Sequence, residues 1–157
     1  MQLTHFSDYA LRVVLYLAMH EDRLVSIREV SETFGVSPNH LVKVVQVLVR
    51  EGLVASTRGR SGGLRLAVAP SAINLGALIR KTEPHLNLLE CFDLETNSCP
   101  IVRACGLKKV MVDAQRAFLG VLDGHTLADV LGQRSQVLRL LGLRSTPRAG
   151  ATILSRA

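Results

Sequence analysis

Apolar residues recur every three or four positions over residues 4–19, which is the spacing of one face of an α-helix. These positions are Phe6, Ala10, Val13, Val14 and Leu17. A Ser-Ile-Arg-Glu run that begins at Ser26 has the form of a capping box, and it predicts a second helix that continues through Phe34. The chain is therefore expected to open with two helices.

A short turn at Gly35-Val36 separates the second helix from a third. Ser37 is expected to cap this third helix and Pro38 to be its first residue, and the helix extends to about Glu51. Two helices joined by a tight glycine-containing turn form a helix-turn-helix. Residues 53–68 then carry two β-prone runs around the glycine-rich stretch 58–63, whose glycines supply the positive φ angles of a hairpin tip. The predicted fold class is mainly α, a winged helix-turn-helix with a long C-terminal dimerisation helix.

The rest of the chain divides into three parts. A short helix is expected over residues 74–81, and periodicity fades between residues 82 and 106. A seam close to the heptad pattern follows, formed by Leu107, Val110, Met111, Ala114, Ala117, Phe118 and Val121, and it predicts a dimerisation helix. Thr126 is expected to cap a last short helix. Residues 134–157 contain five arginines and no acidic residue, and they predict a flexible basic tail. The expected boundaries are 1–81, 82–106, 107–133 and 134–157.

The bulk composition is compatible with a partner that is nucleic acid or an anionic membrane. The chain has 157 residues and a formal net charge of +6, with a pI near 9.8. The sequence shows no basic start followed by an apolar run, so a signal peptide is not expected. It also shows no run of eighteen apolar residues, so a membrane span is not expected. The cytoplasm is the expected location. No arrangement typical of a hydrolase or a nucleotide-binding loop stands out, so an enzyme is not expected.

The third predicted helix carries a polar stripe at positions i, i+4, i+7 and i+11. Asn and Gln side chains pair with adenine edges, and Lys and Arg side chains pair with guanine edges or phosphates. A charged, glycine-rich hairpin at the correct distance favours DNA binding over the alternative of a solvated polar face. The candidate DNA-binding residues are Ser37, Asn39, His40, Lys43, Gln46 and Arg50 on the helix, with Arg58 and Arg60 on the hairpin.

The chain has three cysteines, Cys91, Cys99 and Cys105, in a Cys-x7-Cys-x5-Cys pattern within the aperiodic segment. Structural zinc sites usually have pairs of cysteines two to four residues apart, whereas longer spacings suit a cluster wider than one ion. Nearby acidic residues disfavour a free reactive thiolate, because like charges repel. Three interpretations stay open from the residues alone: a metal or cluster site, a thiol redox switch, and small buried side chains.

Four features together resemble the winged-helix iron–sulfur regulators. They are the opening MQLTHFSDYALRVVLYLA, the run SPNHLVKVV, the hairpin RGRSGGLRLA, and three cysteines before a long helix. The resemblance covers about residues 1–135, and the first two features are most similar to the nitric-oxide-sensing members. Lys108 stands where members that sense iron–sulfur status have a histidine ligand, three residues after the last cysteine.

The resemblance implies a cytoplasmic homodimer with one [4Fe–4S] cluster per subunit. Cys91, Cys99 and Cys105 would bind the cluster, and the fourth ligand would be Asp8 of the partner subunit, with Arg12 one helical turn later beside it. The dimer would repress transcription from a palindromic double-stranded DNA operator and lose operator binding when nitric oxide nitrosylates the cluster. The alternatives are a regulator of iron–sulfur or redox status, and a zinc-controlled or thiol-controlled protein-interaction module.

Overall fold

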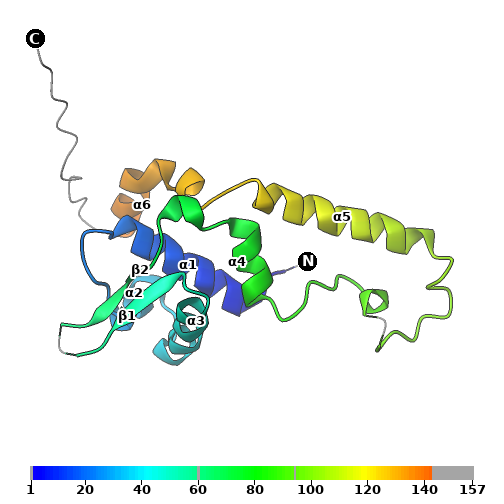
Figure 1. Ribbon diagram of the computed structural model, residues 1–157, viewed down its shortest axis with the longest axis horizontal. Helices are drawn as coiled ribbons and strands as arrows, with labels where there is room; N and C mark the ends of the chain where they lie inside the picture. The colour runs from blue at the N-terminus through cyan, green and yellow to red at the C-terminus, as the bar shows by residue number, and fades with distance from the viewer. Residues whose placement is uncertain (1, 60, 94, 143–157) are drawn as a thin grey trace, which may run out of the picture.

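The computed structural model describes residues 2–59, 61–93 and 95–142. Its first half is a winged helix-turn-helix, the fold class that the sequence predicts (Figure 1). The elements in this half are α1 (His5–Met19), α2 (Ile27–Phe34), α3 (Pro38–Arg50), β1 (Val54–Thr57), β2 (Gly63–Leu66) and η1 (Pro70–Ala72). Strands β1 and β2 pair antiparallel and form the wing, with Val54 opposite Leu66 and Thr57 opposite Gly63.

Side-chain caps set the starts of α1 and α2. Thr4 caps α1, and its Oγ1 accepts a hydrogen bond from the Ser7 amide at 3.3 Å. Ser26 caps α2 and accepts from the Glu29 amide at 3.1 Å. The expected reciprocal half of that capping box is replaced, because the Glu29 carboxylate accepts from the Tyr16 hydroxyl at 2.9 Å and pairs with Arg23. The hydrogen bonds from Arg23 and Tyr16 lower the pKa of Glu29 against the opposing effect of burial.

Helix α3 starts in a different way from α1 and α2. Pro38 occupies the first helical position, and among the described residues the Ser37 side chain has no capping partner. The Ser37 carbonyl instead accepts from the amides of His40 and Leu41 at 3.1 and 3.2 Å. The fixed φ angle of proline and the missing amide donor at that position make the side-chain cap dispensable.

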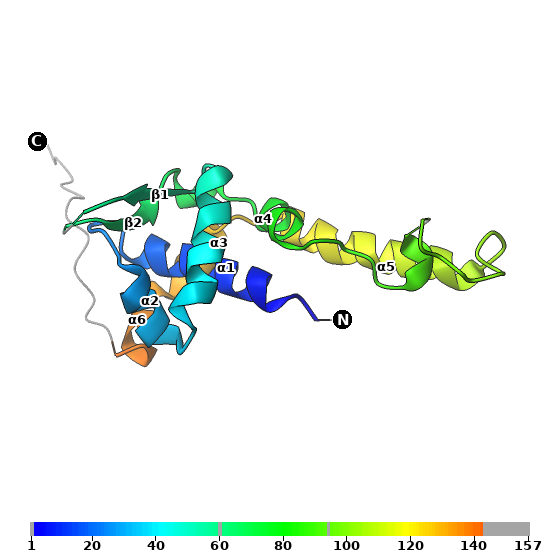
Figure 2. The ribbon, with the colours of Figure 1, turned by 90° about the horizontal axis from the view of Figure 1, so that it is seen from below.

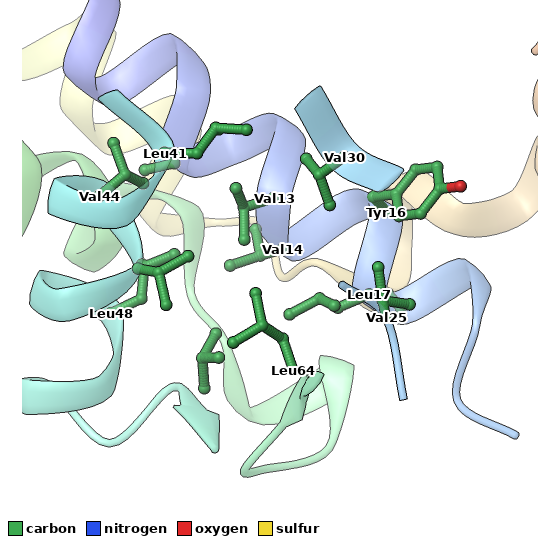
Figure 3. Packing of buried hydrophobic residues seen from close by; sticks show 14 of the residues in the cluster. Val13, Val14, Tyr16, Leu17, Val25, Val30, Leu41, Val44, Leu48 and Leu64 are labelled. Carbon is green, nitrogen blue, oxygen red and sulfur yellow. The ribbon is translucent and has the colours of Figure 1, made fainter. Parts of the chain in front are cut away.

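The core lies between α1, α3 and the wing. Figure 3 shows side chains of α1 facing those of α3 and β2. The large buried residues here include Val13, Val14, Tyr16, Leu17, Leu41, Leu48 and Leu64. Val25 joins the wing to the helices, because it exchanges backbone hydrogen bonds with Leu64 at 3.0 and 2.8 Å. The core therefore holds α3 and the wing in a fixed relation.

The second half leaves this winged-helix unit and then returns to it. It comprises α4 (Leu75–Thr82), η2 (Glu90–Phe92), α5 (Gly106–Asp123), η3 (Ala128–Gln133) and α6 (Arg134–Leu140). Figures 1 and 2 both show α5 projecting away from the winged-helix unit, with the segment from α4 to α5 running along it. Between α4 and α5, where the sequence periodicity fades, the helix that the described residues form is the short 3-10 helix η2.

The chain beyond α5 is also more ordered than the sequence predicts. Residues 134–140, at the start of the tail that the sequence predicts to be flexible, form α6, and Leu138 of this helix is buried in the core. Leu127 is likewise fully buried. The rest of the expected tail, residues 143–157, lies outside the described residues. Across the described chain, no helix is both long enough and apolar enough to cross a membrane.

Candidate DNA-binding surface and cysteine loop

Helix α3 presents its predicted polar stripe to solvent. One face buries Leu41, Val44, Val45 and Leu48 against the core. On the opposite face the predicted residues are all exposed: Ser37, Asn39, His40, Lys43, Gln46 and Arg50. Arg50 lies 3.5 Å from the Glu51 carboxylate, which also pairs with Lys81. Among the described residues, the ion pair on this stripe involves its C-terminal residue Arg50, whereas recognition helices usually contact base edges with their N-terminal half.

An aromatic contact holds the start of α3 against α1. The His40 ring stacks on the Tyr9 ring with 6.3 Å between centroids, and Tyr9 also stacks with His5 at 5.8 Å. The Arg12 guanidinium lies 6.0 Å from the centroid of the same Tyr9 ring. Tyr9 therefore connects two candidate site residues, Arg12 and His40. Sequence analysis did not single it out, because nothing in the local pattern says which residues α1 brings to α3.

The tip of the wing carries an exposed cation. Arg58 is exposed at the hairpin tip, whereas Arg60 lies outside the described residues. Gly59 has a φ of +113°, and a Cβ at Gly62 would come within 2.2 Å of the Thr57 carbonyl oxygen. The tight tip therefore requires glycine, and it brings the backbone around Arg58 into a sharp turn. An exposed cation beside a winged helix is placed to neutralise a DNA phosphate.

Replacing Arg58 by glutamine is expected to weaken DNA binding about equally on all sequences. The slope of log affinity against log salt should fall by about 0.9, because one fewer counterion is released from the duplex. Fluorescence anisotropy between low and moderate salt measures this slope. Arg103→Gln is the matched control, since Arg103 is an exposed arginine in the cysteine-containing segment. Equal slopes for Arg58→Gln and the unmodified protein would remove the wing from the DNA interface.

The three cysteines stand at different places in one loop. Cys91 is buried in η2, while Cys99 and Cys105 are half-buried, and all three thiols are free. Cys105 is the residue that precedes α5, and within the described chain its side chain caps no helix amide. Among the described residues, no three or more His, Cys, Asp or Glu side chains are gathered as a metal site. The structure therefore does not bring the predicted ligand set together in one chain.

Polar contacts shape the loop between the first two cysteines. The Glu90 carboxylate accepts from the amide and the hydroxyl of Ser98 at 2.6 and 2.7 Å. These bonds lower the pKa of Glu90. The Asn97 side chain accepts from the Cys99 amide at 3.2 Å. Glu90 and Asn97 therefore close the first gap between cysteines, a role that the spacing alone did not indicate.

Asp8 and Arg12 form a salt bridge on the first turns of α1. The Asp8 carboxylate accepts from Arg12 Nε at 3.1 Å, and its other oxygen lies 2.8 Å from the terminal nitrogen. Both side chains are 40% exposed. Just before them, the Thr4 amide and hydroxyl donate to Glu83 at 2.8 and 3.0 Å. The start of α1 is thereby tied to the end of α4, where the cysteine-containing segment begins.

The winged helix, the exposed polar face of α3 and the cationic wing define a DNA-binding transcription regulator. The chain belongs to the Rrf2 family, whose model matches residues 3–133 and is described as an iron-dependent transcriptional regulator. It is 43% identical over 145 residues to the HTH-type transcriptional regulator NsrR of Bacillus subtilis, covering 92% of this chain and 99% of that protein.

Solved structures agree with this assignment. An IscR from T. potens is 30% identical, with a TM-score of 0.69 over 87% of this chain and 90% of that chain. The global cysteine regulator CymR of B. subtilis is 27% identical, with a TM-score of 0.65 over 83% of this chain and 95% of that chain. The family and fold predicted from the sequence are confirmed, as is the expectation that the chain is not an enzyme, because its relatives are named transcription regulators.

Proposed function

We propose that this protein is a homodimeric repressor that binds a palindromic operator and responds to nitric oxide through a [4Fe–4S] cluster in each subunit. The observation that carries the proposal is three free thiols in one loop between the winged-helix unit and α5. The similarity to proteins named NsrR over nearly their whole length supports it. A cytoplasmic location follows from this function.

The donor chemistry fits an iron–sulfur cluster. Thiolates are the ligands that such clusters prefer, and Cys91, Cys99 and Cys105 would hold this one. None of these thiols is consumed in a disulfide within the described residues. Asp8 is 40% exposed on α1, so its carboxylate is accessible to a second subunit. When bound, the cluster supplies iron atoms that react with nitric oxide.

In this proposal the Asp8 carboxylate has two alternative binding partners. In one state its carboxylate would serve as the fourth ligand to the cluster of the other subunit. In the other state it pairs with Arg12 of its own helix, as the 2.8 Å contact in this chain illustrates. Arg12 lies over Tyr9, and Tyr9 stacks on His40 at the start of α3. A change of partner at Asp8 thus alters the residues that support the recognition helix.

Helix α5 supplies the dimer seam. Leu107, Val110 and Val121 are 62, 62 and 64% exposed, and within the described chain no α5 side chain is buried. An eighteen-residue helix with a solvent-exposed apolar stripe is stabilised when it packs against a second copy. A two-fold dimer of this kind would place two α3 helices on two half-sites, which matches a palindromic operator.

Iron analysis of anaerobically prepared protein tests this proposal. The unmodified protein should be brown and contain about four irons and four acid-labile sulfides per subunit, as expected for a [4Fe–4S] cluster. Asp8→Ala should lower the iron content on exposure to chelator, because one corner loses its protein ligand. Asp22→Ala is the control, an exposed acidic residue beyond the end of α1. Normal iron retention in Asp8→Ala would exclude Asp8 as a ligand.

A second candidate is a regulator of iron–sulfur status, favoured by the likeness to the T. potens IscR. Lys108 has an ammonium group where that class of regulator would need a neutral histidine ligand, so the nitric oxide response is preferred. A zinc-controlled or thiol-controlled interaction module would show zinc or no metal in the same assay. Iron with sulfide, zinc, and absence of both are therefore three distinguishable outcomes.

A further inference from the structure

The last turn of α5 is attached to both ends of α4, through the cap residue Asn74 and through Arg80 in the last turn. The Arg80 guanidinium binds both oxygens of the Asp123 carboxylate, at 2.5 and 2.7 Å. The Asn74 side-chain amide donates to the backbone carbonyls of Asp123 and His125 at 2.7 and 3.3 Å. The Arg80 hydrogen bonds also lower the pKa of Asp123. A bidentate arginine–carboxylate pair fixes direction as well as distance.

Backbone bonds continue the same attachment. The Leu75 amide donates to the His125 carbonyl at 3.0 Å, and the Leu127 amide donates to the Ile73 carbonyl at 2.8 Å. Ile73 and Leu127 are both buried, at 1% and 0% exposed. The chain leaving α5 is therefore anchored in the core of the winged-helix unit immediately after the ion pair.

Gly76 makes room for the ion pair. A Cβ at this position would lie 2.0 Å from Asp123 Oδ1 and 2.9 Å from the terminal nitrogen of Arg80. Any side chain here would push the carboxylate out of the bidentate arrangement. We define the α4–α5 joint as Asn74, Gly76, Arg80 and Asp123.

Because of its position, a small change of angle at this joint would cause a large displacement of the winged-helix unit. The rest of α5 projects away from the winged-helix unit (Figures 1 and 2), and none of its side chains is buried within the described chain. A small rotation at the last turn of α5 would swing the winged-helix unit relative to the dimer seam. In a two-fold dimer both recognition helices would then move relative to each other, and their separation must match the half-site spacing of the operator.

We infer that the α4–α5 joint determines which half-site spacing the dimer accepts, with Gly76, Arg80 and Asp123 as positioning residues that do not touch DNA. This inference rests on the proposed dimeric operator binding. It predicts that disturbing the joint broadens spacing selectivity while the winged-helix unit still binds a single half-site.

The test uses the full-length protein and an operator selected by that protein from a randomised pool of duplexes. Derivatives carry the two half-sites moved closer or further apart by one and two base pairs, and a further duplex carries one half-site. The unmodified dimer should lose at least about tenfold in affinity on a two-base-pair change. Asp123→Asn and Gly76→Ala should each reduce that penalty to about threefold or less, and leave half-site affinity within about twofold.

A double variant separates this role from a loss of stability. Because Gly76→Ala acts by displacing the Asp123 carboxylate, it should add nothing further in an Asp123→Ala background. Asp113→Asn is the matched control, because Asp113 also pairs with an arginine, Arg116, but within α5 itself. Asp113→Asn should keep the unmodified spacing preference.

The possible results distinguish a failure of the joint as a determinant of spacing from a failure of the proposed dimeric binding. A spacing preference that survives intact in Asp123→Asn and Gly76→Ala would overturn the joint as a determinant, even if the dimer binds as proposed. Lowered half-site affinity in these variants would overturn it too, because the effect would then lie in the winged-helix unit. Absence of any spacing preference in the unmodified protein would instead contradict the proposed dimeric binding.

Discussion

Replacing Val110 and Val121 together by glutamine is expected to convert the proposed dimer into a monomer and to weaken operator binding by at least about 100-fold. The two valines are 62 and 64% exposed in the single chain, on one stripe of α5. Four of them would meet at a two-fold seam, and full burial of each contributes about 1.5–3 kcal/mol. Sedimentation velocity and operator titration measure the two effects.

The control for this variant changes polar positions of the same helix. Lys109→Gln with Asp113→Gln replaces two exposed residues outside the apolar stripe and leaves the net charge unchanged. It should remain dimeric and bind the operator as the unmodified protein does. A valine variant that stays dimeric would show that the subunits associate through another surface, and the proposed role of α5 would be wrong.

Replacing Cys99 by serine is expected to reduce the iron content below about one tenth of that of the unmodified protein, and operator affinity at least about tenfold. A thiolate is the ligand for iron, and a serine hydroxyl does not replace it because it stays protonated at neutral pH. Cys99 suits this test because it is half-buried, whereas Cys91 is buried, so that its substitution also changes packing, and Cys105 directly precedes α5. Iron analysis and anaerobic operator titration provide the readouts.

Ser98→Ala is the matched control for that substitution. It removes the hydroxyl that donates to Glu90 at 2.7 Å and so disturbs the same loop without removing a thiol. Its iron content should stay close to that of the unmodified protein. If Cys99→Ser and Ser98→Ala retained iron equally, the cysteine loop would not be the cluster site.

The DNA-binding half is largely predictable because its signals are local. Cap residues, the proline at the start of α3 and the glycine turn mark element boundaries within a few residues of sequence. The alternation of buried Leu41 and Leu48 with exposed Lys43 and Gln46 follows from helical periodicity alone. The wing was predictable for the same reason, since glycines mark its tip.

The remaining features depend on contacts between distant parts of the chain. Tyr9 contacts His40, which lies 31 positions later in the sequence, and Arg80 contacts Asp123, which lies 43 positions later. No periodicity encodes such pairs. Helix α6 is not predicted, because its arginines suggest a solvated tail, whereas in the structure Leu138 is buried in the core and Leu141 packs against it. The cysteine site is the least predictable part, because its proposed ligands belong to two subunits and are not gathered within the described residues of one.

The most direct test of the proposed nitric-oxide switch measures operator binding by a single anaerobic preparation. The preparation is titrated before and after addition of nitric oxide, and again after removal of iron. The protein with iron and sulfide bound should hold the operator at least about tenfold more tightly than the nitric-oxide-treated and iron-free forms. If all three forms bind the same operator equally, the cysteine loop does not control DNA binding and the proposed switch is wrong.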